Sequence, residues 1–267
     1  LILQPLFGLS QRLSDQLIQE RPKSLEECSG MAFVAPNALV IINDSGNDPE
    51  LFICDTLGEV KQKIALVGIP NRDWESLAYA DGILYIGDFG NNANQRQNLE
   101  IFKINVSKLL SNQEWALSSS IKFRYPEQLN FPPEDSELYY DLEAMIVERD
   151  SIFLFTKNRT KPFDGIVKVY GLCTQQEVQD AKLLKEFKTN VGLKHFNWVS
   201  GACLGPNGDD LFLLGYSKLW YVENWRNNPN PILHSYRLGY FSQKEAIALS
   251  GNSLYIGEEA TPQNPQS

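Results

Sequence analysis

Five segments of the sequence place a carboxylate or a hydroxyl at the same position of a shared pattern. They read ECSGMAF from Glu27, DWESLAY from Asp73, DLEAMIV from Asp141, WVSGACL from Trp198 and QKEAIAL from Gln243. The third letters give a first set of candidates: Ser29, Glu75, Glu143, Ser200 and Glu245. Oxygen donors, carboxylates above all, are what a hard cation such as Ca²⁺ accepts. The sequence predicts a cation site if the fold brings these positions together.

A second apolar run follows each segment after a short turn, as in ILYIGDFGNN from Ile83. The turns contain Gly, Asn, Asp or Pro, which favour chain reversal. The ends of the second runs give another set of polar residues: Asp44, Asp88, Lys157, Tyr216 and Glu258. The loops that follow, from Asn43 and from Gly87, lack the spacing of an EF-hand, so they do not by themselves identify a calcium site.

The elements that must position these residues are short strands. Third and fourth runs rich in aliphatic, β-branched and aromatic residues follow most of the copies, such as LEIFKI from Leu99 and SIKFRYP from Ser120. Positions 29, 75, 143, 200 and 245 lie 46, 68, 57 and 45 residues apart. A four-stranded propeller blade takes about 40–50 residues. The repeat therefore predicts an all-β fold, a β-propeller with four-stranded antiparallel blades, and favours five blades over six.

The last copy is incomplete, because only a short tail follows LYIGEE from Leu254. The N-terminal segment contains the apolar run ILQPLFGL from Ile2, which can complete the last blade. Such a closure would remove exposed sheet edges. We expect residues 1–267 to form one propeller domain that the N-terminal segment closes.

Blade topology brings the two sets of residues to one rim, since inner strands begin where second strands end. Residues two apart on a strand share a face, so Asp73 should point with Glu75, and Asp141 with Glu143. The candidate calcium ligands are Glu75, Glu143, Glu245, Asp88, Glu258 and Asp44. The remaining residues expected at this rim are Ser29, Ser200, Asp73, Asp141, Lys157 and Tyr216. In the alternative interpretation, the glutamates accept hydrogen bonds from backbone amides of the next blade and hold the blades in register.

Charge and composition limit the classes of partner that the chain can have. The chain has 33 acidic and 24 basic residues and a formal net charge of -9, which argues against nucleic acid as a partner. No apolar run approaches the roughly 18 residues that span a bilayer. The sequence begins at Leu1 without Met, so we expect an exported protein that is periplasmic, outer-surface or secreted, and monomeric. The four cysteines form no metal-binding pattern and are expected to be free, buried thiols on different blades.

The repeated motifs resemble the SdiA-regulated family of bacterial proteins, which is distantly similar to NHL-repeat propellers. The resemblance rests on CSGMA at Cys28, DWESLAY at Asp73, DLEAM at Asp141, VSGA at Val199 and KEAIAL at Lys244, in that order. It implies a five-bladed propeller with a bound calcium ion and no established enzyme activity. Carried onto this chain, it implies Glu75, Glu143 and Glu245 as calcium ligands, with Asp88 and Glu258 nearby.

The sequence leaves two candidate functions. The first is a non-catalytic, calcium-binding bacterial propeller that presents its acidic rim to a small molecule or a protein. The second is a calcium-dependent hydrolase of the lactonase or esterase type, in which the metal polarises a carbonyl and activates water. The expected rim contains no histidine, which favours the first function over the second.

Overall fold

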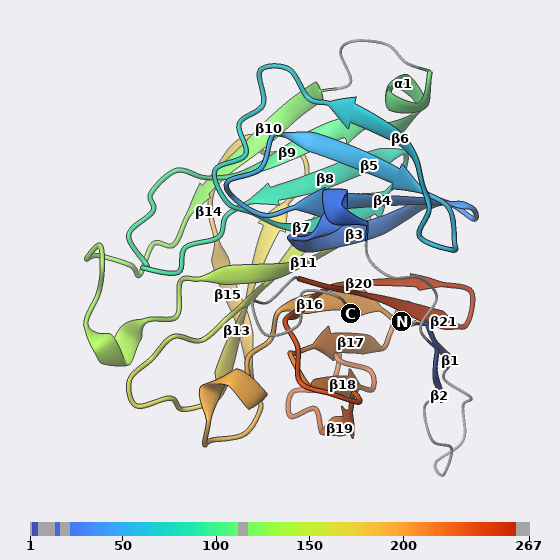
Figure 1. The fold of residues 1–267 in the computed structure, drawn as a ribbon. Helices are drawn as coiled ribbons and strands as arrows, with labels where there is room; N and C mark the ends of the chain where they lie inside the picture. Colours follow the sequence, from blue (N-terminus) through green and yellow to red (C-terminus); the bar gives the residue numbers. More distant parts are fainter. Residues whose placement is uncertain (1, 5–13, 17–21, 112–116, 260–267) are drawn as a thin grey trace.

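The computed structural model describes residues 2–4, 14–16, 22–111 and 117–259. In this part of the chain, 21 strands form five sheets, which we call blades 1 to 5 (Figure 1). Blade 1 contains β3 (Cys28–Ala35), β4 (Ala38–Asn43), β5 (Glu50–Cys54) and β6 (Val60–Ala65). Blade 2 contains β7 (Trp74–Ala80), β8 (Ile83–Asp88), β9 (Leu99–Asn105) and β10 (Leu117–Arg124), with β14 (Val178–Asp180) parallel to β10.

Blade 3 contains β11 (Leu142–Glu148), β12 (Ser151–Thr156), β13 (Ile166–Cys173) and β15 (Lys182–Lys188). Blade 4 contains β16 (Gly201–Leu204), β17 (Leu211–Leu214), β18 (Lys218–Val222) and β19 (Leu233–Arg237). Blade 5 contains β20 (Lys244–Ser250), β21 (Ser253–Glu258), β1 (Ile2–Gln4) and β2 (Ser14–Gln16). The helical elements are α1 (Val106–Leu110) and the 3-10 turns η1 (Lys23–Leu25), η2 (Asp135–Glu137) and η3 (Lys194–Phe196). No helix in the described ranges is long and apolar enough to cross a membrane.

The blades close into a ring. The inner strands contact one another in the order β3, β7, β11, β16, β20 and back to β3, and they lie nearest the middle of Figure 1. Each junction between neighbouring blades holds its own hydrophobic cluster; one, for example, packs Val40 and Ile42 of blade 1 against Leu77 and Leu84 of blade 2. Burying both faces of a blade requires its neighbours. The predicted all-β propeller of antiparallel blades is confirmed.

Burial along the strands follows from this stacking. In β4 five of six residues are buried, because neighbouring blades cover both of its faces. Strand β6, at the outer edge of the same blade, alternates between half-buried and exposed residues. The β7–β8 hairpin turns at Asp81 and Gly82, whose φ angles of 50° and 79° suit a two-residue turn that favours Asp-Gly.

Blade 5 takes its outer strands from the start of the chain. Strand β1 pairs antiparallel with β21, placing Ile2 opposite Tyr255, and β2 pairs with β1. The rest of the ILQPLFGL run lies outside the described residues.

The four cysteines are thiols that form no disulfide in the described chain, but their predicted positions are only partly correct. Cys28 and Cys54 are buried, whereas Cys173 and Cys203 are partly exposed. Cys28 and Cys54 also lie in the same blade, on β3 and β5, because the third strand of the first repeat ends in a cysteine.

Candidate metal centre

A β-bulge recurs at the start of four inner strands. The ladder register shifts between Cys28 and Gly30, and at the matching residues of β7, β11 and β20. The residues skipped by the ladder are Ser29, Glu75, Glu143 and Glu245, all of which are buried. A bulged residue has no partner across the strand, and the bend re-aims its side chain. The bulge thus explains why the side chain of the third residue of the motif points in a direction that regular strand pleating would not give it.

The serines of this set join neighbouring blades. The Ser29 hydroxyl donates to the backbone carbonyl of Trp74 at 2.6 Å. Ser200, immediately before β16, donates to the carbonyl of Lys244 at 2.6 Å. The alternative interpretation had glutamates accepting hydrogen bonds from the next blade. At these two positions a serine hydroxyl instead donates the hydrogen bond between blades, and a backbone carbonyl accepts it.

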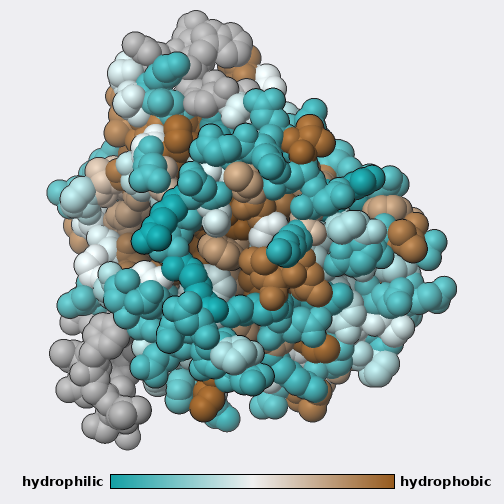
Figure 2. All heavy atoms as spheres, turned by 180° about the vertical axis from the view of Figure 1, so that it is seen from behind, coloured by the Kyte–Doolittle hydropathy of each residue, from teal (hydrophilic) through white to brown (hydrophobic). Residues whose placement is uncertain are grey.

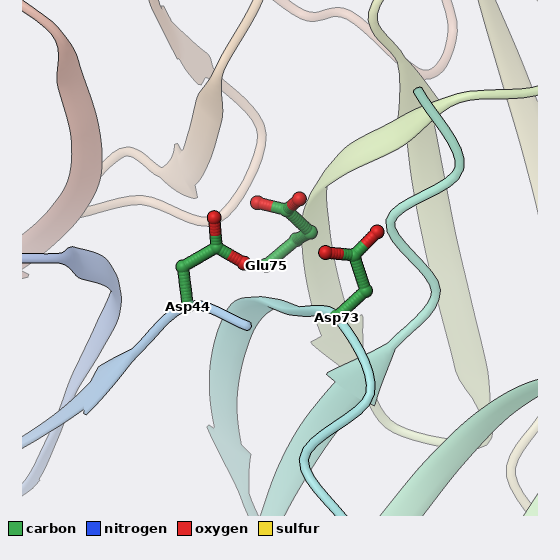
Figure 3. A group of neighbouring side chains, drawn as sticks. All are labelled: Asp44, Asp73 and Glu75. Carbon is green, nitrogen blue, oxygen red and sulfur yellow. The ribbon is translucent and has the colours of Figure 1, made fainter. Parts of the chain in front are cut away.

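Three carboxylates meet between blades 1 and 2. Each of Asp44, Asp73 and Glu75 offers an oxygen, and these oxygens lie within 4.8 Å of one another. Figure 3 shows the three side chains pointing toward one another, Asp44 from the loop after β4, Asp73 from the loop just before β7 and Glu75 from β7 itself. The Asp44 amide donates to the carbonyl of Glu27 at 2.8 Å, which fixes the loop beside the inner strand. We call these three residues the acidic trio.

Gly90 leaves room beside the acidic trio. Its amide donates to the carbonyl of Asp73 at 3.1 Å. A Cβ on Gly90 would lie 2.5 Å from Oδ2 of Asp73 and 2.5 Å from Oε1 of Glu75, closer than real side chains approach. In other blades the residue making the matching backbone bond is Asp44, Lys157 or Glu259. Because blade 2 has a glycine at this position, the carboxylates of Asp73 and Glu75 occupy the space that a side chain would take.

The charge of the acidic trio is poorly compensated. Burial raises the pKa of Glu75 well above its ordinary value, and the charges of Glu143, Asp44 and Glu245 add to the shift. Burial also raises the pKa of Asp44 to about 7, with Asp73 and Glu245 contributing. Asp73 has Arg96 nearby at 3.9 Å, yet burial raises its pKa as well. Such a group of carboxylates takes up either protons or a cation.

Asp88 and Glu258 do not take the position of Asp44, to which the predicted alignment assigns them. Asp88 pairs with Trp74 in the ladder, and Glu258 with Lys244, so each precedes the position that matches Asp44. Glu258 lies one residue before the matching Glu259, and a one-residue slip turns a strand residue to the opposite face. Asp88 lies two residues before Gly90, which makes the matching backbone bond in blade 2. Asp88 is fully buried between two arginines, with Nη2 of Arg96 at 2.9 Å from its Oδ1. Glu258 lies 3.3 Å from Lys244 and accepts a hydrogen bond from the Tyr240 hydroxyl.

Glu259 takes the position expected for Glu258. Its amide donates to the carbonyl of Gln243, as that of Asp44 does to Glu27. Burial raises the pKa of Glu259 to about 8, and its neighbours Glu245, Asp44 and Glu27 contribute. The sequence offers two adjacent glutamates here, and only the strand register decides between them.

The rim surrounds one opening of the central channel, which we call the mouth. Lys157 compensates the charge of the acids on the side of the mouth opposite the acidic trio. Its Nζ lies 2.9 Å from Glu143, 3.6 Å from Glu245 and 3.1 Å from the Tyr216 hydroxyl, which donates to Glu245 at 2.9 Å. Burial alone would lower the pKa of Lys157, but Glu143 and Glu245 raise it well above the ordinary value.

Arg159 pairs with the last acid of the predicted rim, Asp141, at 2.6 Å and lies 3.4 Å from Glu143. Glu143, Glu245 and Asp141 therefore have close cationic partners, whereas the acidic trio has the longer Asp73–Arg96 pair of 3.9 Å.

Beyond the mouth the channel becomes apolar. A cavity of about 220 Å³ is lined by the inner strands, including Met31, Leu77, Met145 and Ile247. Figure 2, the view from behind, shows hydrophobic residues gathered near the middle of a largely hydrophilic surface. The polar chemistry of the channel is thus concentrated at one end.

Comparisons with known proteins show the fold. No family model matches the sequence, and no curated protein is similar to it in sequence. The structure of a nidogen/laminin complex includes a chain with a TM-score of 0.50 and 10% identity, covering 86% of this chain and 72% of that one. The PQQ-bound aldose sugar dehydrogenase from Streptomyces coelicolor has a TM-score of 0.50 and 8% identity, covering 94% and 95% of the two chains. At such identities the likeness shows the propeller architecture alone.

Proposed function

We propose that this protein is a non-catalytic bacterial propeller, similar to the SdiA-regulated family, that binds one calcium ion at the acidic trio and presents the surrounding face to a ligand. The observation that carries the proposal is the trio itself. Glu75 is only 4% exposed, and in the described part of the chain its carboxylate has no ion pair or hydrogen bond. A buried charge without a partner is costly, and a bound cation offsets that cost.

The donor set favours calcium among common cations. Zinc sites are built mainly from cysteine and histidine, and the trio offers only carboxylate oxygens. Magnesium demands near-octahedral geometry and keeps most of its waters. Calcium accepts about six to eight oxygens in flexible geometry, so water and backbone carbonyls can complete the shell around three carboxylates.

The neighbouring groups support binding rather than hydrolysis. In a hydrolase a proton acceptor, most often histidine, stands beside the metal-bound water. His195 packs against Trp198, and His234 packs against Tyr221, so neither histidine lies in the trio. A panel of lactones and esters, assayed with calcium and with a chelator, tests this point; metal-dependent turnover would replace the proposal with the hydrolase function.

Calorimetric calcium titration tests the binding site. We expect one ion per chain in the wild type and at least tenfold weaker binding in Glu75→Gln, because a buried ligand charge is removed. Gly90→Ala should weaken binding similarly, since its Cβ would press on Asp73 and Glu75 without changing any charge. Glu177→Gln, an exposed acid, is the matched control and should bind as the wild type does. Equal affinity in all four proteins would exclude the trio as the site.

We further propose that the protein works in the bacterial envelope or outside the cell. The proposal rests on the calcium site proposed above, because sites of extracellular modules are matched to the higher calcium concentration outside the cytosol. Fractionation of the native host, with detection by antibody, tests it; recovery in the cytosolic fraction would contradict it.

A further inference from the structure

Hydrophobic side chains are concentrated around the acidic mouth. Eight of the sixteen exposed large hydrophobic residues in the described chain lie in four loops, at 66–73, 125–141, 189–200 and 238–243. Each loop runs from the outer part of one blade into the inner strand of the next. Because the inner strands all begin at one face of the ring, these loops surround the mouth. Scattered exposed hydrophobics are ordinary, but clustering of this kind marks an interaction surface.

The largest group is formed by the two loops that lead into blades 4 and 5. Leu193 is 71% exposed, and Phe196, Tyr240 and Phe241 are exposed by 42–51%. The rings of Phe196 and Phe241 lie 5.1 Å apart, and Phe241 lies 6.0 Å from the ring of Tyr216. We call these four residues the aromatic ledge.

The aromatic ledge adjoins the acids of the mouth. The buried Tyr216 lies between them: its ring contacts Phe241, and its hydroxyl donates to Glu245 at 2.9 Å. One tyrosine ring therefore separates exposed apolar surface from carboxylates. A group lying on the ledge can extend a side chain of ordinary length into the mouth.

Negative charge dominates the mouth even with a metal bound. Its carboxylates are those of Glu27, Asp44, Asp73, Glu75, Glu143, Glu245 and Glu259. In the described chain, three cationic side chains lie against these seven acids, those of Lys157, Arg159 and Arg96, so one divalent cation still leaves an excess of carboxylates. This excess repels nucleic acid and anionic lipid, and it opposes face-to-face pairing of two copies of the chain.

We propose that this face binds a partner protein through a loop that sets apolar residues on the aromatic ledge and extends a Lys or Arg into the acidic mouth. The proposal deepens the presenting role given to this face under the proposed function. Basic side chains suit the mouth because a charge-assisted hydrogen bond in a partly desolvated site is stronger than a neutral one. A partner protein is favoured over a small molecule, because further exposed hydrophobics, Leu129 and Phe131, lie in another of the four loops, the one before blade 3.

Selection of displayed peptides tests the proposal. The probe is a phage library of disulfide-cyclised peptides with seven random positions, panned against the whole protein in calcium and again in chelator. We expect the enriched peptides to carry a Lys or Arg flanked by aromatic or aliphatic residues. Synthetic copies should bind at least tenfold more weakly to Phe241→Ser and to Glu259→Gln. They should bind Ile232→Ser normally, since Ile232 is an exposed hydrophobic in the loop between β18 and β19.

A change in the peptide separates the charge from the apolar contact. Replacing the basic residue with norleucine keeps the chain length and should cost at least tenfold in affinity. Peptides without a basic residue, peptides that bind Phe241→Ser as well as the wild type, or no enrichment at all would overturn the proposal. Calcium titration of the same sample reports separately on the metal site, so loss of one result does not imply loss of the other.

Discussion

At the scale of single residues, Asp44 shows how folding places charge where it is costly. Its carboxyl has a pKa of about 7 in the folded chain, against an ordinary value of 3.8, mainly because of burial. A group whose pKa is higher in the folded state stabilises the fold while it is protonated. This contribution to the free energy of unfolding is fully present below about pH 4 and is lost as the pH rises through 7.

The first prediction concerns this pH dependence. In chelator, the wild type should lose free energy of unfolding relative to Asp44→Asn between pH 5 and pH 8, because only the wild type gains the buried charge. Added calcium should reverse the loss at pH 8 and have little effect at pH 5, since protons compete for the same oxygens. Urea denaturation at four pH values measures both effects. Parallel profiles for the two proteins would contradict the assignment of a raised pKa to Asp44.

The second prediction concerns Lys157. Lys157→Met removes the ammonium between Glu143 and Glu245 but keeps most of the side-chain volume. Removing one partner of a buried ion pair costs about 3–5 kcal/mol. We expect a destabilisation of that order at pH 7 and a smaller one at pH 5, where the freed carboxylates can be protonated. Lys161→Met is the control, because the Lys161–Asp135 pair is exposed. Equal urea midpoints for the two variants would show that the Lys157 network contributes nothing.

At the scale of elements, the contact between blades depends on backbone atoms as well as on the hydrophobic clusters. Ser200 is buried, and its hydroxyl joins blade 4 to the first residue of β20. A buried carbonyl that loses its donor pays a desolvation cost.

The third prediction follows from this contact. Ser200→Ala should lower the free energy of unfolding by about 1–2 kcal/mol. Ser136→Ala, an exposed serine in η2, should leave it unchanged. Thermal and urea unfolding compare the two, and an unaltered Ser200→Ala protein would mean that the hydroxyl adds no net stability.

Strand register marks the limit of what the sequence could predict about these elements. The repeat located every inner strand, because apolar runs and turn residues recur with it. It did not reveal the bulge after Cys28 and its counterparts, which depends on how the ladders pair. The pattern also aligns Asp88 and Glu258 with Asp44, whereas the structure places Gly90 and Glu259 there. Which of two adjacent acids faces the mouth is a property of the ladder, not of composition.

At the scale of the whole molecule, the repeat made the architecture predictable and the asymmetry of the site only partly so. Five copies of one motif imply five equivalent positions around a channel. Lys157 and Arg159 then neutralise one side, and Gly90 opens the other, so that the less compensated carboxylates lie between blades 1 and 2. Asp73 could be foreseen at the rim from its alternation with Glu75. Its grouping with Asp44 required the packing of two blades.

The most direct test of the account is a crystal structure of the protein grown with millimolar calcium, with anomalous diffraction to locate the ion. The account predicts one calcium peak between blades 1 and 2, about 2.3–2.6 Å from carboxylate oxygens of Asp44, Asp73 and Glu75. An empty trio at that concentration, or a calcium ion bound only to other residues, would contradict it.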